Sequence, residues 1–441
     1  MAAKSRAMIV AAQPEAAEAG AVVLKQGGNA VDAAMAAALV QGVVDPQMCG
    51  IAGFGSCQIY MPEKGVHTFI DFHGRTPGAA TPDMWENDII GETRDGFGFI
   101  LRDFINDIGY NAVTVPGSLK AYSEAIERFG TWDWKDIVAP AITEAEAGFY
   151  VRPHVHYWWT SGAQMGRGDV TDRLRFSATG RDAYFRNDGS IKRVGDLVSN
   201  PDLANTLRRI ADQGADIFYK GEIAEQIAED FAKNGGILSY DDLATYETVK
   251  TDPLRYTYRG FDITTNQPPG GGIMLNQMMN ILENFDLAGI GHNSDEYIRI
   301  VSEAMKAATA DKDAHVGDPA FFDVPMDRLT SKEYAAEIAA RIRDGEKFHV
   351  PRLGMDGAPE SKQTTHVAVI DDQGNAVTMT HSLGMPSGVI SNGLGFMYNG
   401  CMAVFDPRPG RSGSLAPGKA RFTAVSPTIV FDGDQPMLVL G

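Results

Sequence analysis

The stretch TTHVAVIDDQGNAVTMTHSL, residues 364–383, decides the fold. Apolar and polar side chains alternate on both sides of DDQGN, which is the pattern of two antiparallel strands joined by a tight turn. A second alternating stretch, TAVSPTIVFDGDQPMLVLG, occupies residues 423–441. We therefore expect two β-hairpins here, with the acidic pair of the first turn, Asp371 and Asp372, in solvent.

Segments upstream of these hairpins are mostly helical in pattern. We expect helices at 14–27 and 29–43, a hairpin formed by 58–60 and 66–70, and a mainly helical region over 116–250. SDEYIRIVSEAMKAATADKDA predicts an amphipathic helix that begins after Ser294, with Ile298, Val301, Met305 and Ala308 on one face. Helices in one part of the chain and hairpins in another indicate a layered α+β fold.

The charge of the chain limits its partners. The 441 residues carry a formal net charge of −18, which disfavours binding to nucleic acid or to an anionic membrane surface. The three cysteines have no CxxC spacing and indicate reduced thiols. No signal peptide or membrane-spanning run is evident, so we expect a cytoplasmic protein, or a periplasmic or secreted one if a leader was removed.

One histidine pair is compatible with a metal site. His154 and His156, in RPHVHYWW, would share a face if this segment were a strand. No third ligand is evident nearby. We therefore expect a structural pair, and we expect no metal or other cofactor.

By its local pattern, Thr364 is an ordinary threonine before a strand. Its segment nevertheless resembles the start of the small subunit of γ-glutamyltranspeptidases, which are N-terminal-nucleophile hydrolases. Four further blocks resemble that family in the same order: KQGGNAVDAAMAAALVQGVVDPQMCGIAGFG (25–55), VPGSLKAYSEAIERFGTWDW (115–134), QPPGGGIMLNQMMNILENFD (267–286) and SEAMKAATADKDAHVGDPAFF (302–322). The resemblance implies a four-layer αββα sandwich, with a large-subunit-like region at 1–363 and a small-subunit-like region at 364–441.

The resemblance also implies a self-processing enzyme. In such a precursor the Thr364 hydroxyl attacks the carbonyl of Gln363, and the chain is cut between them into two subunits that form a heterodimer, with further assembly left open. The freed α-amine, whose ordinary pKa is near 8, then acts as base for its own hydroxyl. The substrate would be a small-molecule or peptide amide, and the acyl acceptor would be water or an amine.

Two further side chains are candidates for roles beside Thr364. The family has a second hydroxyl on the return strand that hydrogen-bonds the nucleophile, and Ser382 holds that position. The alternative is an ordinary strand serine. His366 would face the same way as Thr364 if the strand began early enough, and it is the alternative base.

The group that binds the substrate carboxylate in this family differs here. The family's arginine aligns with His73, and Arg75 follows two residues later. Its paired serines become Thr423 and Ala424, and an asparagine on the return strand becomes Gly384. We expect His73, Arg75, Gly384 and Thr423 to contribute to substrate binding in its place.

The group that binds the substrate ammonium is also altered. The family's acidic residue aligns with Val404, and a nearby amide-bearing residue aligns with Cys401. An apolar valine cannot pair with an ammonium group, and an unpaired buried charge is costly. We therefore expect an amidohydrolase or acyltransferase whose acyl group lacks the α-amine.

Two alternatives remain open. One is a true γ-glutamyltransferase or glutathione hydrolase, and the other is a scaffold homologue that never cuts itself. The family's Ser-Pro-Gly-Gly oxyanion turn would follow MLVLG, where this sequence stops. We accordingly expect a C-terminally truncated form of a longer protein.

Overall fold

The computed structural model describes residues 7–93, 96, 98–162, 166–351 and 364–441. The helices are α1 (Pro14–Lys25), α2 (Ala30–Val44), α3 (Ser118–Phe129), α4 (Trp134–Ala147), α5 (Pro153–Thr160), α6 (Val170–Phe176), α7 (Ala178–Tyr184), α8 (Pro201–Gln213), α9 (Asp216–Tyr219), α10 (Glu222–Lys233), α11 (Tyr240–Ala244), α12 (Gly272–Leu282), α13 (Leu287–Ile290), α14 (Asp295–His315), α15 (Met326–Leu329) and α16 (Lys332–Arg343). The strands are β1 (Met8–Ala11), β2 (Phe54–Met61), β3 (Val66–Phe72), β4 (Ile89–Glu92), β5 (Phe99–Leu101), β6 (Phe149–Tyr150), β7 (Leu197–Val198), β8 (Val249–Thr251), β9 (Leu254–Tyr258), β10 (Phe261–Thr265), β11 (Thr365–Ile370), β12 (Ala376–Ser382), β13 (Thr428–Asp432) and β14 (Gln435–Leu440).

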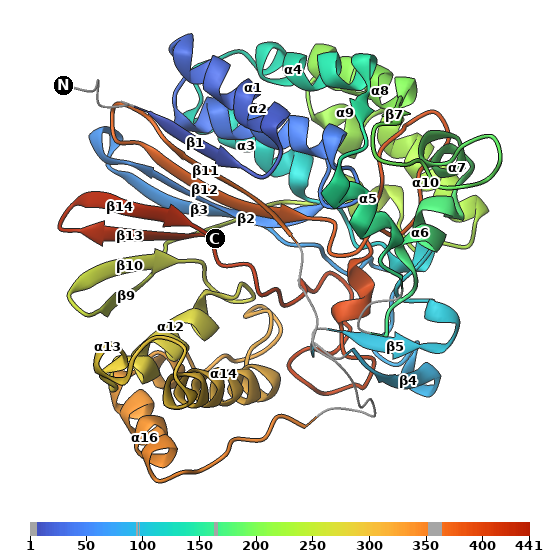
Figure 1. Cartoon of the computed structure of the whole chain (residues 1–441). Helices are drawn as coiled ribbons and strands as arrows, with labels where there is room; N and C mark the ends of the chain where they lie inside the picture. Colours follow the sequence, from blue (N-terminus) through green and yellow to red (C-terminus); the bar gives the residue numbers. More distant parts are fainter. Residues whose placement is uncertain (1–6, 94–95, 97, 163–165, 352–363) are drawn as a thin grey trace.

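Two antiparallel sheets lie between two groups of helices (Figure 1). The larger sheet has the order β1-β11-β12-β2-β3-β8, and the smaller has the order β14-β13-β10-β9. Helices α1 to α4 and α8 lie on the outer side of the larger sheet, and α12, α14 and α16 lie beyond the smaller one (Figure 1). The predicted layered α+β fold is confirmed, and its order in space is helix, sheet, sheet, helix.

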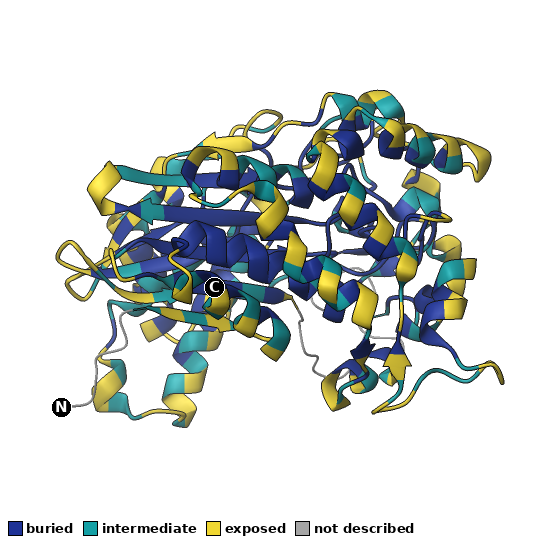
Figure 2. Ribbon diagram, turned by 90° about the horizontal axis from the view of Figure 1, so that it is seen from above, coloured by how far each residue is buried: buried dark blue, intermediate teal, exposed yellow. Residues whose placement is uncertain are grey.

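The two sheets meet through apolar and polar side chains. Ala376 of the larger sheet packs with Ile429 and Phe431 of the smaller one, and all three are buried. The Thr378 hydroxyl donates to the carbonyl of Leu440 at 3.0 Å. Figure 2 shows the result: buried residues follow the strands and the central helices, while exposed residues lie on the outer helices and loops.

The regions 1–363 and 364–441 share both sheets. Strands β11 and β12 pair with each other and lie between β1 and β2, which come from the start of the chain. Strand β13 likewise pairs with β10. The two regions therefore form one packed unit, and the boundary between them stays a prediction.

Helix α2 is buried on all sides and fixes the larger sheet. Asn29 caps it by accepting hydrogen bonds from the amides of Val31 and Asp32, and every residue of the helix except Gly42 is buried. Its alanines allow close approach: a Cβ on Gly20 of α1 would lie 2.9 Å from the Ala33 carbonyl oxygen. Such tight contact needs small residues on both helices.

The turn of the β11–β12 hairpin is anchored to that helix. The prediction that its acidic pair lies in solvent was wrong for Asp371, which is 5% exposed. Its carboxylate accepts hydrogen bonds from the amides of Ala30, Gln373 and Asn375, each at 3.0 Å. The hairpin is thus tied to the N-terminus of α2, where a negative charge is favourable.

Two other expectations need correction. Helix α14 begins after Ser294 as predicted, and Ala308 of the predicted face is buried. Ile298 and Met305, however, are about half exposed, and Ile300 and Ala304 belong to the buried face. The segment that contains His154 and His156 is helix α5 and not a strand. The two histidines therefore do not share a strand face.

Candidate active site

Thr364 lies at the point where the larger sheet opens onto a cavity of about 250 Å³. It directly precedes β11, whose first paired residue, Thr365, lies opposite His381 of β12. Continuing that register by one residue places Thr364 opposite Ser382. Both residues line the cavity, together with Phe54, Trp158, Arg167, Thr380, Gly384, Met385, Gly400, Val404, Arg421, Thr423, Ala424, Val425, Ser426 and Gly441. Gln363, the predicted residue before the cut, lies outside the described residues.

Ser382 is positioned by the backbone that follows it. Its side chain is 1% exposed, and its Oγ accepts a hydrogen bond from the Gly384 amide at 2.9 Å. Gly384 has a φ of 73°, a left-handed conformation that favours glycine. Because the amide occupies a lone pair, the hydroxyl proton of Ser382 stays available for a group in the cavity.

His366 is held away from the cavity. Its Nδ1 is 2.8 Å from Thr380 Oγ1, and its Nε2 is 3.0 Å from Thr378 Oγ1. Burial lowers the pKa of His366 to about 4. Both ring nitrogens are engaged by threonine hydroxyls of β12, which is the arrangement of a structural histidine.

A buried polar network supports the strand behind Thr364. The Thr365 hydroxyl accepts a hydrogen bond from Gln41 Nε2 at 2.9 Å, and Gln41 Oε1 lies 2.8 Å from His381 Nε2. The other ring nitrogen of His381 lies 2.6 Å from the hydroxyl of Tyr122. These contacts fix the start of β11 against α2 and α3.

The network predicts a pH-dependent stability. Burial, reinforced by His366 nearby, lowers the pKa of His381 to about 3, whereas in the unfolded chain it titrates near 6.5. As the pH falls below 6.5 the unfolded chain takes up a proton that the folded protein excludes, so this contribution to stability is lost. Through His381 alone, the free energy of unfolding of the wild-type protein should fall by about 2 kcal/mol between pH 7 and pH 5. Urea denaturation at both pH values checks this: in His381→Gln the loss should be smaller by that amount, and an equal loss would contradict the assignment.

His73 and Arg75 line a different cavity, of about 440 Å³. His73 is 5% exposed, and neither of its ring nitrogens has a hydrogen-bond partner in the described part of the chain. Burial, with Arg421 and Arg75 nearby, lowers the pKa of His73 to about 3. A neutral imidazole cannot supply the charge of the family's arginine. Arg75 itself donates to the carbonyl of Gly418 at 3.4 Å and lies over the ring of Tyr246.

The other aligned positions do meet at the Thr364 cavity. Gly384, Thr423, Ala424 and Val404 all line it. No aspartate or glutamate is among the described residues that line this cavity. The structure therefore brings together Thr364, Ser382, Gly384 and Thr423, and separates them from His73 and Arg75.

Two arginines that the sequence analysis missed line the Thr364 cavity, Arg167 and Arg421. Arg421 is 7% exposed, and its Nη1 donates to the Cys401 sulfur at 3.0 Å. Its guanidinium also lies over the ring of Phe54, 4.4 Å from the centroid. A signal was present, since Arg421 stands two residues before Thr423 and side chains two apart share a face of an extended segment.

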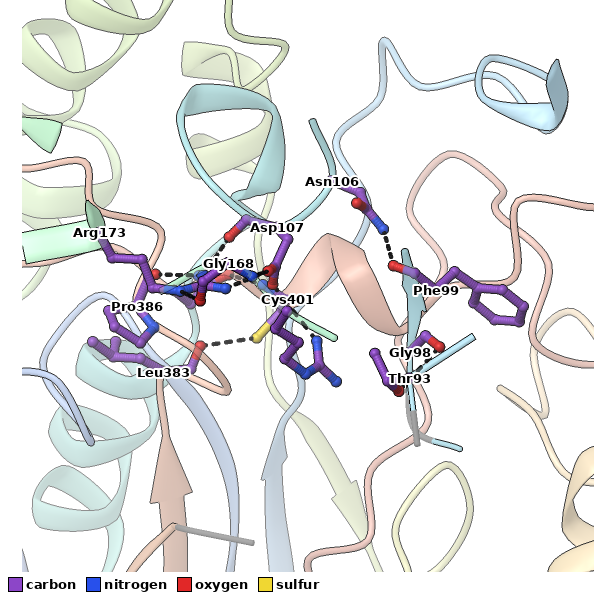
Figure 3. Close-up of polar contacts among 12 residues, drawn as sticks. Thr93, Gly98, Phe99, Asn106, Asp107, Gly168, Arg173, Leu383, Pro386 and Cys401 are labelled. Carbon is purple, nitrogen blue, oxygen red and sulfur yellow. Dashed lines mark hydrogen bonds and ion pairs between the residues drawn. The ribbon is translucent and has the colours of Figure 1, made fainter. Parts of the chain in front are cut away.

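A buried ion pair holds the cavity wall. Asp107 pairs with Arg173, which is fully buried, and accepts a hydrogen bond from the Gly168 amide at 3.1 Å. Arg173 also donates to the carbonyl of Pro386 at 2.9 Å. Figure 3 shows the Arg173 side chain extending toward Asp107 and Gly168, with Pro386, Leu383 and Cys401 nearby. The pair therefore links the segment after β12 to the region around Arg167.

Two features are absent from the residues that the structure describes. Within them no group of three or more histidine, cysteine or acidic side chains is placed to hold a metal ion. None of the helices described here has the length and apolar character needed to cross a bilayer.

Comparisons with known proteins place the chain in a family. The family model described as gamma-glutamyltranspeptidase matches residues 16–441. The chain is 38% identical to the acylase ACY 1 proenzyme of Pseudomonas sp. (strain SE83), over 99% of this chain and 76% of that protein. It is 34% identical to the glutathione hydrolase proenzyme of Pseudomonas sp. (strain A14), over 98% and 75% respectively.

A solved structure shows the same fold. The crystal structure of cephalosporin acylase from Bacillus halodurans superposes with a TM-score of 0.82 at 29% identity, covering 98% of this chain and 76% of that one. With the family model matched over nearly the whole length and a threonine at the head of the central strand, this chain belongs to the γ-glutamyltranspeptidase family of hydrolases and transferases.

Proposed function

We propose that this protein is a self-processing amidohydrolase or acyltransferase with Thr364 as its nucleophile. The observation that carries the proposal is the meeting of two residues at one cavity: Thr364, which directly precedes β11, and Ser382, which ends β12. Relatives described as proenzymes support the self-processing step.

Processing follows from the chemistry of a threonine hydroxyl. Thr364 Oγ1 attacks the carbonyl carbon of Gln363, the peptide C–N bond breaks, and an ester forms while the α-amine of Thr364 takes a proton. Water then hydrolyses the ester, which leaves a carboxylate on Gln363 and restores the hydroxyl. The new terminus carries both a nucleophile and its own base.

The same groups then act on a substrate amide. The α-amine of Thr364 accepts the hydroxyl proton as Oγ1 attacks the substrate carbonyl, and that proton goes to the leaving amine. The acyl group stays on Thr364 as an ester until water or another amine removes it. Ser382, which lies opposite Thr364 when the β11–β12 register is continued by one residue, donates a hydrogen bond to Thr364 Oγ1 and fixes the direction of this hydroxyl.

The two pieces would remain together as a heterodimer. After the cut, β11 and β12 still lie between β1 and β2, and β13 still pairs with β10. Separation would expose two sheets and their apolar core to water, which is strongly unfavourable. We propose no nucleic-acid or membrane partner for the pair, only a small amide substrate and an acceptor.

The acyl group of the substrate is proposed to lack an α-amine. Val404 stands where the family binds the ammonium group, and no carboxylate lines the described cavity. A true γ-glutamyl enzyme is the second candidate, favoured by the 34% identity to a glutathione hydrolase.

Mass spectrometry tests the reaction. The wild-type protein, freshly made and then aged, should become two pieces whose masses sum to the whole plus one water. Brief reaction with an amide substrate followed by an acid quench should add the acyl mass to the peptide that begins at Thr364. A chain that stays whole while it hydrolyses amides would overturn the proposal, and a whole chain without activity would favour the scaffold alternative.

A further inference from the structure

Arg421 is a buried cation without an anionic partner in the described part of the chain. It is 93% buried, yet no carboxylate there lies within 4.0 Å of its guanidinium. The other two strongly buried arginines, Arg173 and Arg167, both pair with Asp107. Because burying an unpaired charge is costly, a buried guanidinium of this kind is typical of a site for an anionic ligand.

The groups that hold Arg421 are neutral. Its Nε donates to the Phe422 carbonyl at 3.1 Å, its Nη1 donates to the Cys401 sulfur, and its plane stacks on Phe54. Burial raises the pKa of the Cys401 thiol, so the sulfur is not a thiolate near neutral pH. These contacts fix the orientation of the guanidinium without neutralising its charge.

Part of the guanidinium remains for a ligand. Within the described residues its Nη2 has no hydrogen-bond acceptor, and the side chain lines the cavity that contains Thr364. A fixed, planar pair of N–H groups matches the two oxygens of a carboxylate. Gly384 keeps this space open, because a Cβ there would lie 3.0 Å from Arg421 Nη1.

The surrounding charges select against an ammonium group. Arg167 lines the same cavity, and no acidic side chain among the described residues does. A positively charged group on the ligand would face Arg421, which has no carboxylate partner among the described residues, and Arg167, which shares Asp107 with Arg173. The cavity therefore suits an acyl chain that is negative at its far end and carries no amine.

We infer that Arg421 is a specificity-determining residue that binds a terminal carboxylate of the acyl group. The substrate class is then a monoamide of a short dicarboxylic acid. This inference rests on the proposed function, because it assumes that Thr364 attacks the amide at the other end of the same chain.

Four anilides that differ by one group at a time test the inference. Glutaryl 4-nitroanilide has the carboxylate alone, the γ-glutamyl compound has carboxylate and ammonium, the 4-aminobutanoyl compound has the ammonium alone, and the butanoyl compound has neither. We expect kcat/KM to be highest for glutaryl, at least tenfold above butanoyl, and lowest for 4-aminobutanoyl. A γ-glutamyl rate equal to or above the glutaryl rate would overturn the claim that the site rejects the amine.

Variants at Arg421 separate charge from shape. Arg421→Met should lower kcat/KM for the glutaryl anilide on the order of 100-fold, and at least tenfold more than it lowers the butanoyl value. The butanoyl hydrolysis that remains shows that the variant is folded. Arg421→Lys should recover part of the loss. The matched control is Arg128→Met: Arg128 also stacks on a phenylalanine ring but does not line the cavity, so glutaryl hydrolysis should be unchanged.

A binding measurement keeps the inference testable if no anilide reacts. Calorimetry should detect glutarate on the wild-type protein, with butanoate at least tenfold weaker and with glutarate lost in Arg421→Met. If glutarate binds and no amide is cut, the proposed reaction is wrong and the carboxylate site is supported. If glutarate binds equally to wild type and Arg421→Met, or binds neither, the inference is overturned.

Discussion

Replacing Thr364 with alanine is expected to yield one uncut chain and to lower amide hydrolysis by at least about a thousandfold. Alanine has no hydroxyl, so neither the ester at Gln363 nor the acyl-enzyme can form. A denaturing gel and intact-mass analysis read out the cut, and release of nitroaniline reads out catalysis. Thr364→Ser keeps a hydroxyl and should still be cut, although more slowly.

The neighbouring threonine supplies the matched control. Thr365 also carries a hydroxyl, but it lies against α2, where Gln41 donates to it. Thr365→Val removes that hydroxyl at nearly constant shape and leaves one N–H of the Gln41 amide without its acceptor, while the other still donates to Gln13 at 2.6 Å; the cost is about 1–3 kcal/mol. The variant should still be cut before residue 364. A cut that needs Thr365 and survives Thr364→Ala would contradict the assignment of the nucleophile.

The central hairpin could be predicted because one physical constraint governs it. Successive side chains from 365 to 370 point alternately toward the helices and toward the second sheet, so the alternation of side chains indicates the strand directly. The turn fixes the register, and the register places Thr364 opposite Ser382. The relation between these two residues is therefore the part of the site that is most directly encoded in the sequence.

Helix α14 shows where periodicity fails. The large apolar residues Ile298 and Met305 were expected to face the core, yet Ala304 and Ala307 are buried instead. Helix α14 packs against α12 and α16, and close helix packing favours small residues at the contact. Hydrophobic periodicity alone cannot distinguish the buried face, which carries alanines, from the neighbouring face, which carries Ile298 and Met305.

Arg421 was missed because its position depends on a long-range pairing. Residues 421–427 form no regular strand, but the Arg421 amide donates to the Gly74 carbonyl at 3.2 Å. This contact places the arginine beside His73, on the side of the Thr364 cavity, while the residues at 73 and 75 line another space. The family resemblance identifies His73 as the equivalent of the family's arginine. It does not show that a neighbouring segment, the one with Arg421, brings a guanidinium group to the cavity.

Removing the Asp107 carboxylate is expected to destabilise the protein strongly. In Asp107→Ala the guanidinium of Arg173, which is fully buried, loses its anionic partner. Breaking one side of a buried ion pair costs about 3–5 kcal/mol, which is a large part of a typical stability of about 5–15 kcal/mol. Urea denaturation of wild type and variant measures the difference in the free energy of unfolding.

A double variant tests whether the unpaired charge is the cause. Asp107→Ala combined with Arg173→Met removes both charges, so it should be more stable than Asp107→Ala alone. Asp212→Ala breaks the exposed pair with Lys135 and should change the stability little, because water and salt screen such a pair. If Asp107→Ala cost no more than Asp212→Ala, the pair would not be holding the wall of the cavity. Because Arg173 also binds the Pro386 carbonyl and Asp107 also pairs with Arg167, the loss of stability should be accompanied by slower cutting at residue 364 under conditions in which the variant remains folded.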